Sequence, residues 1–62
     1  MKTVEMIVLD YIENKVFIYR NLKYSDFTYA NQIDSFLEKN HSKYSSWMIR
    51  EKIEIVELKD KV

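Results

Sequence analysis

Two apolar stretches decide the fold of this chain: residues 3–12, TVEMIVLDYI, and residues 15–22, KVFIYRNL. Both are rich in the β-branched and aromatic residues that favour strands. Only Glu13 and Asn14 separate them, and Asn tolerates the positive φ angle of a tight turn. Because the chain has no Gly, Asn14 takes the role that Gly has in most hairpins. We therefore predict a β-hairpin over these two stretches.

A helix is predicted to follow the hairpin. Ser25 suits the N-cap, and Asp26 would lie in the first turn, where the helix dipole favours a carboxylate. Asn40 is the expected left-handed stop, and His41 would then lie favourably at the C-terminal end. Apolar residues recur at helical spacing between these ends, at Tyr29, Ala30, Ile33, Phe36 and Leu37. This pattern predicts a helix of about fifteen residues with one apolar stripe.

A third strand is predicted from about Trp47 to Leu58, where apolar and charged residues alternate. Residues 59–62 are expected to fray. The predicted order is ββαβ, an α+β fold in one small domain over residues 1–62. A right-handed crossover sets the third strand parallel to the second. The simplest result is a three-stranded antiparallel sheet in the order 2-1-3, with one helix packed on one face.

The short length of the chain predicts marginal stability. A compact protein of 7.6 kDa buries roughly 3,900 Å² of apolar surface, which contributes roughly 95 kcal/mol. Ordering 62 residues costs about 93 kcal/mol. The two contributions cancel, and the chain has no Cys for a disulfide. Burial against another chain is therefore expected to matter.

Composition excludes several classes of protein. The absence of Cys and Gly excludes a disulfide scaffold, a Cys-based zinc site and a glycine-dependent phosphate loop. The longest apolar run, residues 6–9, is too short for a membrane span or a signal peptide. We therefore expect a cytoplasmic protein with no membrane partner. The abundance of Lys, Asn, Ile, Tyr and Phe is typical of an AT-rich gene of a microbe, a phage or a mobile element.

Both faces of the predicted hairpin are apolar, and this observation leads to the candidate binding site. If Tyr11 pairs with Val16, one face is aliphatic and suits the helix: Ile7, Leu9, Tyr11, Val16 and Ile18. The other face would stay exposed, and we predict that it binds protein through Met6, Val8, Ile12, Phe17 and Tyr19. A three-residue turn would instead pair Ile12 with Val16. The alternative that the polar loop and the C-terminal tail cover this face also stays open.

No residue pattern indicates catalysis, a metal or a cofactor. His41 is the only His, and a His at the end of a helix is more simply explained by the helix dipole than by nucleophilic catalysis. It has no second His at the spacing of a metal site, and no Asp-rich calcium loop is present. We therefore expect a protein that is not an enzyme.

The main functional prediction is a small protein–protein interaction module. It would be a homodimer, or it would bind and inhibit a larger protein. The alternative is a single-strand nucleic-acid binder, in which bases stack on sheet aromatics and basic side chains follow the phosphates, namely Lys15, Arg20 and Lys23. A second basic and aromatic cluster follows the predicted helix, at Lys43, Tyr44, Trp47 and Arg50. A net charge of +0 argues against nucleic acid.

Overall fold

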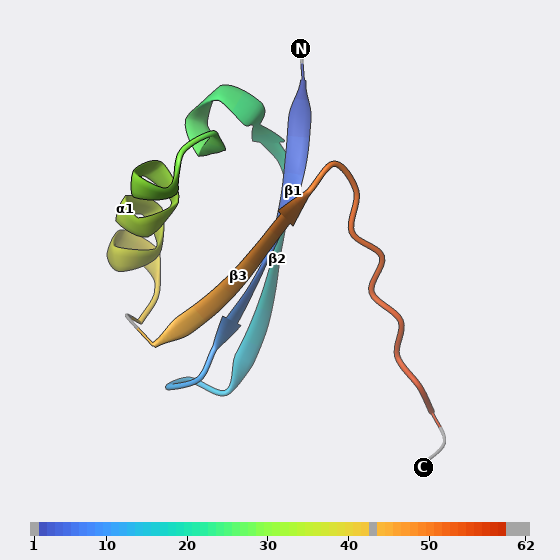
Figure 1. The fold of residues 1–62 in the computed structure, drawn as a ribbon. Helices are drawn as coiled ribbons and strands as arrows, with labels where there is room; N and C mark the ends of the chain where they lie inside the picture. Colours follow the sequence, from blue (N-terminus) through green and yellow to red (C-terminus); the bar gives the residue numbers. More distant parts are fainter. Residues whose placement is uncertain (1, 43, 60–62) are drawn as a thin grey trace.

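A computed structural model describes residues 2–42 and 44–59 of the chain. Three strands, one 3-10 helix and one α-helix follow in the order β1 (Thr3–Asp10), β2 (Lys15–Lys23), η1 (Tyr24–Phe27), α1 (Ala30–Asn40) and β3 (Ser45–Arg50). Figure 1 shows α1 on one side of the sheet and the C-terminal tail on the other. The predicted α+β fold with ββαβ order is confirmed.

The sheet has β1 at its centre, in the order β2-β1-β3, and β1 is antiparallel to both neighbours. This is the predicted 2-1-3 order. The hairpin register differs from the prediction by two residues, since Leu9 rather than Tyr11 pairs with Val16, and Ile7 pairs with Ile18. A shift of two residues keeps every side chain on the same face of the sheet. The predicted division between the two faces is therefore correct for the residues that lie in the strands, whereas Tyr11 and Ile12 lie in the turn.

The hairpin turn spans residues 11–14, one residue earlier than a turn centred on Glu13 and Asn14. Asn14 has a φ angle of 57°, so it occupies the left-handed region as predicted. Asp10 Oδ1 accepts hydrogen bonds from the backbone N–H groups of Ile12 at 3.1 Å and Glu13 at 3.0 Å. The Asp10 carboxylate thus closes the turn, which sequence reasoning did not expect.

An irregularity in the register lies near the other end of the hairpin, between Val4 and Met6 of β1. Asn21 of β2 lies in this region with a φ angle of 61°. A bulge of this kind adds one residue to a strand and increases its twist. It lets Leu22 and Tyr19 both pack against the core cluster, although simple alternation would place them on opposite faces.

The α-helix begins later than predicted, and Tyr29 rather than Ser25 is its N-cap. The residues before it form η1 instead, and Phe27 of η1 packs against the core. Gln32 ties the two helices together. Its Oε1 accepts from the N–H groups of Thr28 at 2.9 Å and Tyr29 at 2.8 Å, and its Nε2 donates to the carbonyl of Ser25 at 3.1 Å.

The end of α1 also differs in detail from the prediction. Asn40 is not in the left-handed region, because Asn14 and Asn21 are the positive-φ residues among those described. The C-cap is His41, whose backbone is extended and whose N–H donates to the Leu37 carbonyl at 2.7 Å. The Asn40 side chain donates instead to the Phe36 carbonyl at 2.9 Å. At eleven residues, α1 is the longest helix in the described part, and none there has the length and apolar character to cross a membrane.

The core lies between α1 and the face of the sheet that we call the inner face. Met6 and Val8 are fully buried there, and Ile33 and Leu37 of α1 cover them. Aromatic rings close the sides, with Phe36 in edge-to-face contact with both Tyr19 and Phe27 at 5.3 Å between ring centroids. Edge-to-face pairs of this kind add to the stabilisation that comes from burial. The inner face is thus the aromatic face of the hairpin, not the aliphatic one.

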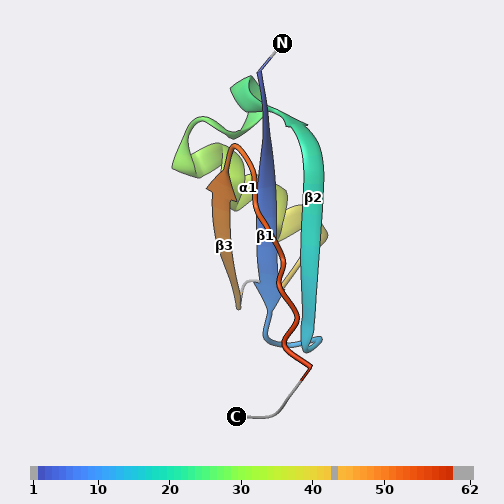
Figure 2. The same cartoon turned by 90° about the vertical axis from the view of Figure 1, so that its right-hand side faces the viewer.

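The third strand ends at Arg50, well before the predicted end at Leu58. The chain bends at Glu51 and continues as an extended tail, residues 52–59, without regular secondary structure. Figure 2 shows the tail in front of β1, on the side of the sheet opposite α1. The predicted alternation of apolar and charged residues continues past the bend, but residues 52–59 do not belong to the sheet. Residues 60–62, part of the segment expected to fray, lie outside the described residues.

Candidate interaction surface

The predicted binding residues do not form an exposed face. Met6 and Val8 have no exposed surface, and Phe17 and Tyr19 pack against the core cluster under α1. Ile12 lies apart from them in the hairpin turn and is exposed. The prediction chose the wrong face for the helix, because it matched the apolar stripe of the helix to the aliphatic residues of the hairpin, whereas α1 packs on the aromatic ones. The hydrogen bonds that Asp10 accepts from the turn explain how a carboxylate can lie on the buried side.

The opposite side of the sheet, which we call the outer face, is apolar and partly exposed. It carries residues whose strand positions alternate with those of the core: Ile7, Leu9, Val16, Ile18 and Met48. Leu9 is 36% exposed, Val16 is 60% exposed and Met48 is 38% exposed. No charged residue interrupts this set. The aliphatic face that was expected under the helix is therefore the face that a partner can reach.

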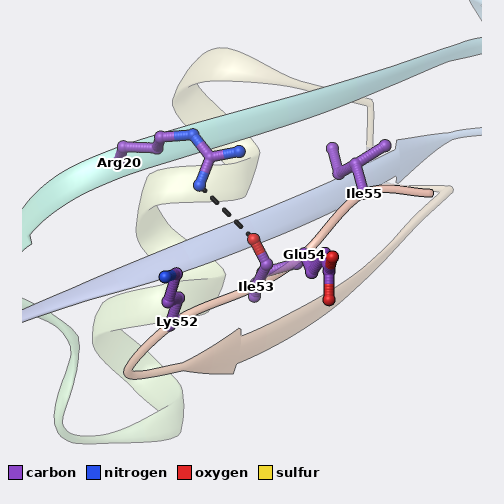
Figure 3. A pocket seen from close by; sticks show the side chains of 5 residues that line it. All are labelled: Arg20, Lys52, Ile53, Glu54 and Ile55. Carbon is purple, nitrogen blue, oxygen red and sulfur yellow. Dashed lines mark hydrogen bonds between the residues drawn. The ribbon is translucent and has the colours of Figure 1, made fainter.

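A three-residue cluster fixes the start of the tail at one end of the outer face. Glu5 Oε1 accepts hydrogen bonds from the Ile53 N–H at 2.7 Å and from Arg20 Nη1 at 2.9 Å. Arg20 Nη1 also lies 3.4 Å from the Ile53 carbonyl, as Figure 3 shows. The bond from the Ile53 N–H is the main reason that the pKa of Glu5 lies below its ordinary value of 4.5, and Arg20 lowers it further. We call this cluster the tail clip.

The tail clip buries Ile53, of which only 6% is exposed. The tail beyond it is apolar and open to solvent, since Ile55, Val56 and Leu58 are 52%, 68% and 75% exposed. Beside the clip lies an open hollow of about 560 Å³, lined by Arg20 of β2 and by residues 52–55 of the tail (Figure 3). The tail thus covers one end of the outer face and leaves the rest accessible.

A buried polar chain joins both strands of the hairpin to the end of α1. His41 Nε2 and the Tyr19 hydroxyl share a hydrogen bond of 2.6 Å, and His41 Nδ1 lies 3.7 Å from Asp10 Oδ2. The side chains of His41 and Asp10 are each 3% exposed. The bond from the Glu13 N–H is the main reason that the pKa of Asp10 lies below its ordinary value of 3.8, while burial raises the pKa of the Tyr19 phenol.

Asp10, His41 and Tyr19 are residue types that take part in acid–base catalysis, but here their polar atoms are not accessible to a substrate. A catalytic group has to reach its substrate directly or through one water. The imidazole of His41 instead contacts the ring of Phe17, at 4.7 Å between centroids, and lies at the end of the core. Sequence reasoning placed His41 correctly at the helix terminus, but it found neither partner, because Asp10 and Tyr19 are distant in sequence.

The basic residues of the nucleic-acid alternative do not share a surface with the predicted stacking rings. Lys15 pairs with Glu13 at 3.5 Å, beside the turn. Arg20 belongs to the tail clip, and Lys23 is exposed at the far end of β2. The rings expected beside them lie under α1.

The second basic and aromatic cluster is divided between the two faces. Trp47 pairs with Val8 and lies on the inner side, whereas Arg50 pairs with Glu5 and lies on the outer side. Tyr44 is exposed and precedes β3, and Lys43 lies outside the described residues. Within residues 2–42 and 44–59, no cluster of His, Cys, Asp or Glu is arranged to hold a metal ion.

Comparisons with family models, with curated proteins and with solved structures found no match to this chain. The function is therefore argued from the surface itself.

Proposed function

We propose that this protein is a non-enzymatic binding module that docks another protein on its outer face. The observation that carries the proposal is the partial exposure of an uncharged apolar surface on one side of a thin sheet, centred on Leu9, Val16 and Met48. Contiguous exposed apolar surface on a small protein marks interaction sites. Unlike Met6 and Val8, which the sequence suggested, these side chains are accessible without unfolding the core.

Three further features support protein binding over the other functions considered. The acid–base groups Asp10 and His41 are buried, so they offer no surface to a substrate. Arg20 is already paired with Glu5, which reduces its attraction for a phosphate. An apolar surface with an uncharged centre suits a protein partner, since the centres of protein interfaces are depleted in charged residues.

Site-specific photocrosslinking tests this proposal without assuming the identity of the partner. A photoreactive phenylalanine derivative replaces Val16 on the outer face or, as the matched control, Tyr29 at the start of α1. These residues are 60% and 67% exposed, and both are apolar. We expect irradiation of expressing cells to give protein adducts from position 16 that are much weaker from position 29. Loss of the position-16 adducts in a Met48→Lys background would assign them to the outer face.

Two results would contradict the proposal. Adducts of equal strength from both positions would indicate nonspecific contact, and no adducts from position 16 would mean that the outer face has no protein partner. Binding of mixed single-stranded oligonucleotides that weakens steeply with salt and with Lys15→Ala or Arg20→Ala would favour the nucleic-acid alternative instead.

A further inference from the structure

We infer that the partner on the outer face is a second copy of this chain, packed face to face about a twofold axis. This inference rests on the proposed function, because it names the occupant of the same surface. A twofold interface brings the same patch of both copies together, so the patch has to be complementary to itself. Three properties of the chain support such an interface. They are an exposed surface larger than that of a compact monomer, the distribution of its charges and its extended tail.

The exposed area of the chain exceeds that of a compact monomer. The accessible surface is 5303 Å², whereas a folded protein of 7.6 kDa is expected to expose about 4,300 Å². The surplus is about 1,000 Å², to which the extended tail and the outer face both contribute, and a standard protein interface buries about 800 Å² on each partner. One interface between two copies is therefore large enough to remove the surplus.

The charges of the chain favour a copy of itself over a charged partner. The net charge is +0, so two copies do not repel each other at long range. The centre of the outer face is uncharged. At one end of this face, Glu5 is paired with Arg20 at 2.9 Å within the same chain, and Arg50 of β3 lies opposite Glu5. Face-to-face packing thus buries apolar surface against apolar surface at the centre of the interface, and the charged side chains of Glu5, Arg20 and Arg50 lie at one end of it.

The tail extends the surface that a second copy can contact. The tail clip holds Ile53, and in the described part of the chain no backbone hydrogen bond is recorded for residues 54–59. Figure 2 shows the tail in front of β1, so a second sheet that faces the outer face at the usual spacing of about 10 Å would contact the tail as well as the strands. Each tail then continues from its clip along the second copy, where Ile55, Val56 and Leu58 lose their exposure to water.

Sedimentation velocity over a range of about 1 μM to about 500 μM, which covers weak and strong dimers, tests the inference on the full chain. We expect a species of twice the 7.6 kDa chain mass that dissociates on dilution. Val16→Asp places one new charge on each side of the interface and is expected to weaken the dimer about 100-fold or more. Leu58→Asp tests the tail and is expected to weaken the dimer about 10-fold.

The matched control is Tyr29→Asp, which adds the same charge at an equally exposed residue on the other side of the molecule and places a favourable residue at the N-cap. It is expected to leave the dimer intact. Circular dichroism of each variant verifies the fold, and if Val16→Asp unfolds, Val16→Thr keeps the strand and serves in its place.

A monomer at every concentration would overturn the inference, as would a dimer that Val16→Asp does not weaken. The crosslinking experiment separates the two proposals. Position-16 adducts to other proteins, together with a monomer, would refute the second copy and keep the binding module, whereas no adducts and a monomer would refute both.

Discussion

Adjacent residues of β2 lie on opposite faces of the sheet, so alanine substitutions at Phe17 and Val16 should have very different effects on stability. Phe17 is partly buried, packs against the core and contacts the His41 ring. Val16 is 60% exposed on the outer face. Both are strand-favouring residues in the same strand, so both substitutions lose similar strand propensity. The difference between them therefore reports which face α1 covers.

The structure sets the expected magnitude. Removal of a core Phe side chain costs about 3–5 kcal/mol, and the partial exposure of Phe17 places Phe17→Ala near about 3 kcal/mol. Val16→Ala is expected to cost about 0.5 kcal/mol, as is usual for a surface position. A chain of this length has a total stability of about 3–9 kcal/mol. Phe17→Ala is thus expected to lower the melting temperature by about 10 °C or more, and to approach complete unfolding.

Urea unfolding followed by the fluorescence of Trp47, the single Trp of the chain, measures both variants. Trp47 lies on the inner side of β3, opposite Val8, so its environment changes when the core opens. The experiment is done at low micromolar concentration, where association contributes least. If Val16→Ala were as destabilising as Phe17→Ala, or more so, then α1 would pack on the outer face and the surface proposed for binding would be the core.

Two further predictions concern the buried polar chain. Tyr19→Phe leaves His41 Nε2 without its hydroxyl partner in a buried site, so it is expected to cost about 1–3 kcal/mol of unfolding free energy in the same urea assay, and an unchanged midpoint would contradict the 2.6 Å bond. The pKa of Asp10 is lower in the folded protein than its ordinary value of 3.8. The ionised Asp10 carboxylate therefore stabilises the fold above pH 3.8, and this stabilisation is lost as the pH falls through the pKa of the folded state. Wild type should therefore lose stability below about pH 4, and Asp10→Asn should reduce that slope, whereas an equal slope in both would refute the role of Asp10.

The sequence predicted the features that depend on alternation and local chemistry. The order of the strands, the assignment of Ile7 and Met6 to opposite faces and the positive φ of Asn14 all follow from patterns within one element or from rules of chain connection. The assignment of strand residues to the two faces stays correct despite an error of two residues in register, because strand side chains point to the same face at every second residue.

The sequence could not predict which face of the sheet α1 covers, since both sides of β1 are apolar. The prediction placed the helix on the aliphatic side, and no local pattern indicated that Asp10 on the other side could be buried, because the hydrogen bonds that it accepts come from the turn. The number of aromatic residues was the better guide. Tyr19 packs against the ring of Phe36 on α1 and Phe17 against the ring of His41, and large rings dominate the energy of a small core.

The helix start and the end of β3 were missed for different reasons. The N-cap was not evident because the Tyr29 side chain makes no capping hydrogen bond, and only Gln32 at the third helical position, whose Oε1 accepts from the Tyr29 N–H, indicated it. The alternation after Arg50 is typical of a strand, but the Glu5 carboxylate captures the N–H of Ile53 and turns the chain over the sheet. That contact joins residues 48 positions apart, so no local pattern reveals it.

The strand at the centre of the sheet is also the first one in the chain, and this order affects how the protein can be made. Pairing of Glu5 with Arg50 closes a long loop, and such distant contacts form late and slow folding. During synthesis β1 can pair with β2 early, but its other edge has no partner until Arg50 has been added. The hairpin therefore keeps one open edge until β3 has been made, and truncated products that lack β3 are expected to aggregate.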